Sequence, residues 1–202
     1  MTREVLHIQV PRRAARLGIL SLLVLGCLLL AGCTSDANDR ATRLFSLLLR
    51  ASDLPPCWQR TRGVIGDWDQ ESKGIISRSV GFRGVPEQQR GDVLVSQELI
   101  NYPSAAQAGE AYPSIVRVVI PTKSWSWPEQ VSFRSQADQL QVACVQDPDS
   151  PETTWCSGVA QYGSFISVVR ANVFEEQWLT MEDLERLLES VDARMAAARD
   201  QP

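Results

Sequence analysis

Histidine is almost absent from this chain of 202 residues, since the only one is His7. This scarcity excludes Ser-His-Asp and Cys-His nucleophile systems, and zinc sites that depend on histidine, from the rest of the chain. It also removes the usual general base near neutral pH. Because no other pattern indicates catalysis, the sequence predicts a protein that is not an enzyme, with no catalytic residues and no cofactor.

Lysine is scarce as well. Lys73 and Lys123 are the only two, and the formal net charge of the chain is −4. Proteins that bind nucleic acid cluster lysine and arginine to neutralise phosphates. Beyond its amino-terminal segment this chain has no basic run, so it predicts no nucleic-acid partner.

Acidic side chains gather in two short stretches, 67–71 and 147–149. Oxygen clusters of this kind can hold calcium. Neither stretch has the Asp-x-[Asp/Asn]-x-[Asp/Asn]-Gly pattern of an EF-hand loop. We therefore interpret both as solvated turns and predict no metal site.

The amino-terminal segment is first basic and then apolar. Residues 1–16 hold four arginines and one acid, Glu4, and the run from Leu17 to Gly32 carries no charge. That run is shorter than the roughly 20 residues that span a bilayer core. A basic region, a short apolar run and small residues at its end are typical of a secretory signal peptide. A retained membrane-anchor helix is the alternative.

The end of the apolar run, Leu30-Ala31-Gly32-Cys33, resembles the lipobox of bacterial lipoproteins. In that family the cysteine thiol is alkylated with diacylglycerol and the signal is cut just before it. Val24-Leu25-Gly26-Cys27 is a weaker match, because cleavage there would leave three leucines at the new amino terminus. An ordinary cysteine behind a conventional cleavage site is the other alternative. The resemblance implies lipidation of Cys33 and attachment to the cell membrane or outer membrane, on the extracytoplasmic side.

These boundaries divide the chain into a signal peptide at 1–32, a lipidated cysteine with a short tether at 33–38, and a globular part at 39–202. Removing the first segment makes the chain three charges more negative, because four arginines and one glutamate leave with it. The remaining length is that of one ordinary domain.

Hydrophobic periodicity and turn residues predict the elements of the globular part. Helices are expected near 39–51, after Ser104 as N-cap, and over 181–198, where Thr180 and Asp183 form a capping box. Strands are expected near 58–66, 74–82, 92–102, 131–135, 139–146, 154–161 and 164–173. Strands joined by short turns pair antiparallel. The sequence therefore predicts an α+β fold, an antiparallel sheet of about six to seven strands packed by helices in a single domain.

The strand at 92–102 predicts its own two faces, because successive side chains of a strand point to opposite sides. One face is expected to carry Val93, Val95, Gln97, Leu99 and Asn101. The other is expected to carry Leu94, Ser96, Glu98 and Ile100.

Three cysteines, Cys57, Cys144 and Cys156, follow Cys33. Outside the cytoplasm such thiols tend to be oxidised, and three leaves one unpaired. In a hairpin whose turn is centred near Ser150, antiparallel register puts Cys144 directly opposite Cys156, at a distance that a disulfide can bridge. We predict this bond. The alternative is that Cys57 bonds one of the two.

Two tryptophans, Trp125 and Trp127, alternate on a proline-flanked loop. Exposed aromatic side chains at these positions would stack on a sugar or contact a partner protein, so both are candidate ligand-binding residues. The alternative is that both indoles pack on the core, where large aromatic side chains usually lie.

The segment from Leu47 to Trp58 resembles one found in small envelope lipoproteins and in the extracellular sensor domains of some membrane Ser/Thr kinases. There the pattern reads Leu-Leu-x-x-x-Asp-Leu-Pro-Pro-Gly-Trp, and Cys57 replaces the glycine in this chain. Asn101-Tyr102-Pro103-Ser104-Ala105-Ala106 and the cysteine-bearing hairpin are similar too. The resemblance implies an α+β domain, often disulfide-bonded and suspected of ligand sensing, and it transfers no functional residue.

These observations predict a lipid-anchored extracytoplasmic lipoprotein of the cell envelope. Its domain would act without catalysis, as a ligand-binding, sensor-like or protein-interaction module. The expected partners are the membrane, through the lipid, and an envelope protein or a small ligand. The alternatives are a carboxylate-dependent envelope hydrolase and a structural envelope protein.

Overall fold

A computed structural model describes residues 38–56, 58–61, 64–84, 94–120, 126–129, 131–174 and 179–199. The chain forms two compact units, residues 1–40 and 41–202, and the second holds the sheet. Cys33, Cys57 and Trp125 lie outside the described residues, so lipidation, the signal peptide and the domain boundaries stay predictions. No helix among the described residues is long and apolar enough to cross a membrane.

Among the described residues the sheet has seven strands, all paired antiparallel. Its order is β1-β3-β4-β7-β6-β5, with β2 pairing beside β1 on β3. The strands are β1 Trp58–Arg60, β2 Val64–Ile65, β3 Ile76–Gly84, β4 Leu94–Asn101, β5 Gln139–Asp147, β6 Ser150–Tyr162 and β7 Phe165–Phe174. The α+β fold predicted from the sequence is confirmed. The single strand predicted near 58–66 is instead two short ones, β1 and β2.

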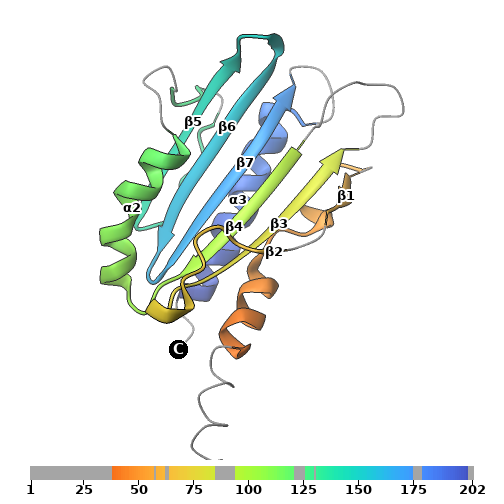
Figure 1. The fold of residues 1–202 in the computed structure, drawn as a ribbon. Helices are drawn as coiled ribbons and strands as arrows, with labels where there is room; N and C mark the ends of the chain where they lie inside the picture. Colours follow the sequence, from red (N-terminus) through yellow and green to blue (C-terminus); the bar gives the residue numbers. More distant parts are fainter. Residues whose placement is uncertain are drawn as a thin grey trace, which may run out of the picture. The chain divides into compact units, whose positions relative to one another are not determined.

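The helices α2 (Ala105–Val119) and α3 (Met181–Arg199) lie on opposite faces of the sheet (Figure 1). A further helix covers 38–47, and two 3-10 turns are η1 (Ala51–Asp53) and η2 (Glu71–Lys73). The larger core joins α3, residues 41–54 and one sheet face. A second core joins α2 and the other face. We call these the α3 face and the α2 face.

Local signals place the helix starts as predicted. The Ser104 side chain accepts a hydrogen bond from the Gln107 N–H at 3.2 Å. At α3 the Thr180 N–H donates to the Asp183 carboxylate at 2.9 Å, and the Asp183 N–H donates back to the Thr180 hydroxyl at 3.2 Å. This reciprocal pair is the predicted capping box. Pro113 lies inside α2 on its exposed side, where water can bond the carbonyl that a proline leaves unpaired.

Strand β4 separates its side chains as predicted. Val95 and Leu99 are fully buried in the α3-face core, whereas Ile100 is fully buried in the α2-face core. On the α3 face the Gln97 side chain accepts the Leu49 N–H at 2.6 Å and donates to the Ser167 hydroxyl at 3.0 Å. Glu98, one residue on, therefore points to the α2 face.

The hairpin of β5 and β6 carries the predicted disulfide. Cys144 and Cys156 are register partners and are bonded, so this prediction is confirmed. The expected register holds as far as Gln146 and Thr154, and then shifts so that Asp147 pairs with Ser150. The turn is therefore tighter than predicted, and the additional residues lie in β6.

The strand predicted near 131–135 is wrong. Residues 131–137 belong to no strand, and side chains of α3 take backbone donors of this segment. The Ser132 N–H donates to Glu185 at 2.7 Å, and the Gln136 N–H donates to Asp192 at 3.0 Å. Asp192 is buried and also accepts the Tyr162 hydroxyl at 2.8 Å.

Candidate functional site on the α2 face

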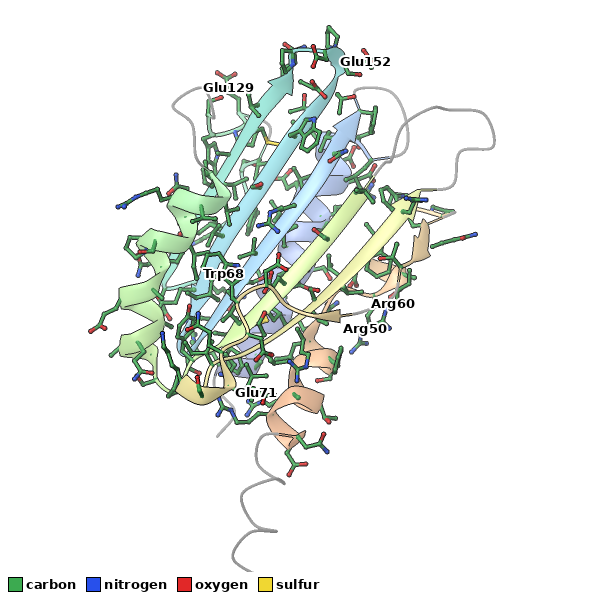
Figure 2. The ribbon with its side chains drawn as sticks, viewed as in Figure 1. Arg50, Arg60, Trp68, Glu71, Glu129 and Glu152 are labelled. Carbon is green, nitrogen blue, oxygen red and sulfur yellow. A yellow bond between two sulfur atoms is a disulfide. The ribbon has the colours of Figure 1, made fainter. Side chains whose placement is uncertain are left out.

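The α2 face is only partly covered. Helix α2 packs against β6 and β7, over Val159, Ile166 and Val168. The chain between β2 and η2 covers the neighbouring part, and Figure 2 shows Trp68 of this segment in front of the sheet, on the side of α2. Figure 1 shows no helix of the described residues in front of this face toward the β5–β6 turn. Side chains of the central strands are therefore open to solvent there.

Strand register brings together the side chains of this uncovered region. On β6 and β7, Trp155 pairs with Asn172. Arg170 pairs with Ser157 of β6 on one side and with Ser96 of β4 on the other. We give the name open strip to five of the α2-face residues that solvent reaches: Leu94, Ser96, Trp155, Arg170 and Asn172.

Two large apolar side chains of the open strip are exposed, Leu94 to 41% and Trp155 to 47%. The Trp155 indole N–H donates to the Asp147 carboxylate at 3.0 Å, and the second oxygen of that carboxylate accepts the Asp149 N–H at 3.0 Å. These bonds fix the edge of the indole and leave ring surface exposed. Trp155 is not among the candidate residues predicted from the sequence. The position of Cys156 could have indicated it, because a strand residue whose side chain points into the α3 face has a neighbour that points to the α2 face.

Glu98 lies beside the open strip and is buried, with 4% of its surface exposed. One carboxylate oxygen accepts the Trp68 N–H at 3.1 Å and also the Ser77 hydroxyl. Burial raises the pKa of this carboxyl above its ordinary value, and the negative charge of Asp67 raises it further. The hydrogen bonds from Ser77 and Trp68 and the positive charge of Arg170 lower this pKa and so reduce the shift. Burial, with a smaller contribution from the charge of Glu98, also raises the pKa of Tyr102.

Gly66 allows the chain to close over Glu98. A β-carbon at this position would lie 1.8 Å from the Ser77 hydroxyl oxygen and 2.2 Å from the Glu98 carboxylate oxygen. The Gly66 N–H donates to the Ser77 carbonyl at 3.1 Å. A nearby ion pair joins Asp69 to Arg78 at 2.5 Å. These contacts hold residues 66–70, which we call the covering loop, against β3 and β4.

The covering loop decides what Glu98 can do. Both hydrogen bonds that Glu98 accepts come from groups that hold this loop on the sheet, and little of the carboxyl meets solvent. The open strip beside it offers an indole, a guanidinium, an amide and a hydroxyl. Such groups bind by stacking, ion pairing and hydrogen bonding, so the arrangement favours binding over bond cleavage.

The pH dependence of stability tests whether the pKa of Glu98 is raised in the folded protein. Because its folded-state pKa is raised, Glu98 contributes stability below its unfolded pKa, and this contribution is lost as pH rises through the folded pKa. We expect Glu98→Gln to remove this loss, because an amide keeps the accepting oxygen without charge. Urea unfolding of both proteins from roughly pH 4 to pH 8 would show the variant gaining on the wild type as pH rises. Parallel stability profiles would contradict the assignment.

The predicted site residue Trp127 lies elsewhere. Ser126 pairs with Cys144 along the outer edge of β5. Trp127, the next residue, therefore lies beside that edge and is not part of the open strip. Its indole is 47% exposed and its N–H donates to the Val131 carbonyl at 3.0 Å. Trp127 is therefore not packed in the core, which was the alternative given above. The role of Trp127 in binding stays a prediction. No group of three histidine, cysteine or acidic residues within the described ranges is placed to hold a metal ion.

Comparison with known proteins places the fold. No protein-family model matches this sequence, and no curated protein sequence matches it. The fold is similar to that of the extracellular domain of PknH from Mycobacterium tuberculosis. The TM-score is 0.55 at 10% sequence identity, and the match covers 80% of this chain and 97% of that domain. PknH is a membrane Ser/Thr kinase, so the predicted resemblance to such extracellular domains is confirmed for the fold.

Proposed function

We propose that this chain is a lipid-anchored, non-catalytic binding domain on the extracytoplasmic side of the cell envelope. The open strip carries this proposal. It combines exposed tryptophan and arginine side chains, the residue types that most often dominate binding energy in protein interfaces. The fold shared with the extracellular domain of PknH supports the same compartment.

Arg43, near the start of the sheet unit, lies at the opposite end of the sheet from the open strip. Arg43 donates to the carbonyl of Ala198 at 2.9 Å and lies over the ring of Phe165, 5.8 Å from its centroid. Phe165 begins β7, directly after the β6–β7 turn, whereas Trp155 lies toward the β5–β6 turn. A strand rises about 3.4 Å per residue, so Arg43 and the strip lie at opposite ends of the sheet.

Lipid attachment has a direct test. We expect labelled palmitate to enter the wild-type protein and not Cys33→Ala, because the thiol is the site of diacylglycerol transfer. Cys27→Ala is the matched control and is expected to label like the wild type. Label in Cys33→Ala would contradict the assignment, and loss of label only in Cys27→Ala would move the site to Cys27.

Binding at the open strip can be tested in membranes of the producing cell. A ligand that binds only the folded state raises the midpoint of thermal unfolding. We expect the wild-type protein to unfold at a higher temperature in its own membranes than after purification in detergent. Trp155→Ala should lose this difference, whereas Trp127→Ala should keep it. Equal midpoints in both settings, or a difference that survives in Trp155→Ala, would contradict the proposal.

A carboxylate-dependent hydrolase is the second candidate. One observation favours it: the pKa of Glu98 is raised and Asp67 lies close enough to contribute, and paired carboxyls with separated pKa values perform acid–base catalysis. The covering loop keeps Glu98 from solvent, which favours the binding role. The midpoint difference in membranes distinguishes the two, because Glu98→Gln would preserve it in a binding domain.

A further inference from the structure

The open strip is positively charged on a protein whose net charge is negative. Arg170 is exposed at its centre, and Arg83 of β3 is exposed beside Leu94 of β4, its register partner. Glu98 of β4 lies beside the strip and is buried under the covering loop, and both Arg170 and Asp67 of that loop are close enough to affect its pKa. The formal net charge of the whole chain is −4. The charge of the strip, which comes from Arg170, is therefore opposite in sign to the net charge of the whole chain.

A second carboxylate, that of Asp147, lies at the margin of the strip. Both of its oxygens are engaged, one by the Trp155 indole and one by the Asp149 backbone. It positions the tryptophan and is not directed at Arg170, which lies on β7, two positions before the register partner of Trp155. The strip thus presents a cation between apolar groups.

The groups of the open strip lie on three adjacent strands, β4, β7 and β6. Trp155 and Asn172 are neighbours on adjacent strands, and continuing the β4–β7 register puts Leu94 on the far side of Asn172. Strands lie about 4.8 Å apart, so the two apolar side chains are separated by roughly 10 Å. Arg170 lies about 7 Å from Asn172 along β7. The three side chains therefore mark the corners of a triangle, with Arg170 at one corner and the two apolar side chains at the others.

We infer that the open strip binds an acidic segment of a partner protein, in which a carboxylate pairs with Arg170 and apolar side chains pack on Trp155 and Leu94. This inference rests on the proposed function and names its partner. A guanidinium pairs with a carboxylate through two parallel hydrogen bonds. The strip is built on a sheet face, and small ligands prefer concave sites, so a protein segment fits it better than a small molecule does.

The test uses the full chain in detergent and a defined probe, fluorescein-labelled poly(Glu,Tyr), which supplies carboxylates and aromatic groups on a peptide backbone. Fluorescence anisotropy gives the Kd at fixed salt. We expect Arg170→Glu to weaken binding at least ten-fold. Arg117→Glu makes the same charge change on the exposed surface of α2 and is expected to leave the Kd within two-fold. Trp155→Ala and Trp127→Ala form the matching pair for the apolar contact.

Each result decides the inference. Binding of poly(Glu,Tyr) that is lost in Arg170→Glu and retained in Arg117→Glu supports it. It is overturned by an absence of binding, by equal effects of both arginine variants, or by tighter binding of polygalacturonate, which would make the strip a site for an anionic glycan. Circular dichroism checks that each variant is folded. If Trp155→Ala abolishes the stabilisation in membranes but poly(Glu,Tyr) does not bind, the proposed function stands and the acidic partner does not.

Discussion

Replacing Gly66 by alanine is expected to lower the free energy of unfolding by about 2–4 kcal/mol and to release the covering loop. The new methyl group would lie 1.8 Å from the Ser77 hydroxyl oxygen and 2.2 Å from the Glu98 carboxylate oxygen. Overpacking costs about 1–3 kcal/mol, and a buried group left without its hydrogen bond costs about as much. Urea unfolding measures the loss, and hydrogen exchange at the Trp68 amide reports release of the loop.

The matched control for this prediction is Gly109→Ala. Gly109 lies inside α2, and the nearest atoms to its missing β-carbon belong to Gln161, at 3.6 and 3.7 Å, an ordinary contact. Alanine there is expected to stabilise the protein by up to about 1 kcal/mol, because glycine is a poor helix former. If Gly66→Ala were as stable as the wild type and kept the Trp68 amide protected, the close approach at Glu98 would not hold the loop.

Replacing Cys144 and Cys156 together by alanine is expected to lower the free energy of unfolding by about 3 kcal/mol. The two cysteines are separated by 12 positions, and the bond restricts the unfolded chain. Both side chains are buried in the α3-face core. Urea unfolding of the oxidised wild type and the double variant measures the difference, with Cys57→Ser in both proteins to prevent exchange.

Reduction of the wild-type protein is the control for this second prediction. The reduced protein is expected to match the double variant to within about 1 kcal/mol, because both lack the cross-link. A double variant as stable as the oxidised protein would contradict the stabilising role. The hairpin also carries Trp155, so loss of the bond is expected to weaken binding at the open strip.

Sequence alone predicts those parts of the fold that depend on short-range patterns. Alternation along 92–102 predicts that Leu99 and Glu98 point to opposite faces, because a half-buried strand has a period of two. The pairing of Cys144 with Cys156 follows from the same geometry, since both strands of a hairpin share one turn. The caps at Ser104 and Thr180 are local as well.

The features of the fold that the sequence does not predict depend on contacts between residues far apart in the chain. Residues 131–135 have the composition of a strand, but Glu185 and Asp192, more than 50 positions away, take their backbone donors. Glu98 meets Ser77 through the pairing of β3 with β4, but it meets Trp68 only because a loop 30 positions earlier folds over the sheet. No local pattern indicates such a contact.

The candidate site shows the same limit. Trp125 and Trp127 are selected from the sequence because they alternate on one loop. Strand alternation would also have placed Trp155 on the α2 face once Cys156 was assigned to the core. Arg170 and Leu94 join Trp155 only through the order β4-β7-β6, which places strands from distant parts of the chain side by side. The sequence of a single chain does not reveal that order.

Photo-crosslinking from the open strip tests the central claim most directly. Benzoylphenylalanine would replace Leu94 in the full chain produced in cells, and Val118, exposed to 61% on α2, would be the control position. The account predicts an adduct from position 94 that disappears in Arg170→Glu, and no such adduct from position 118. An absence of adducts at 94, or equal adducts from both positions, would show that the open strip is not the binding surface.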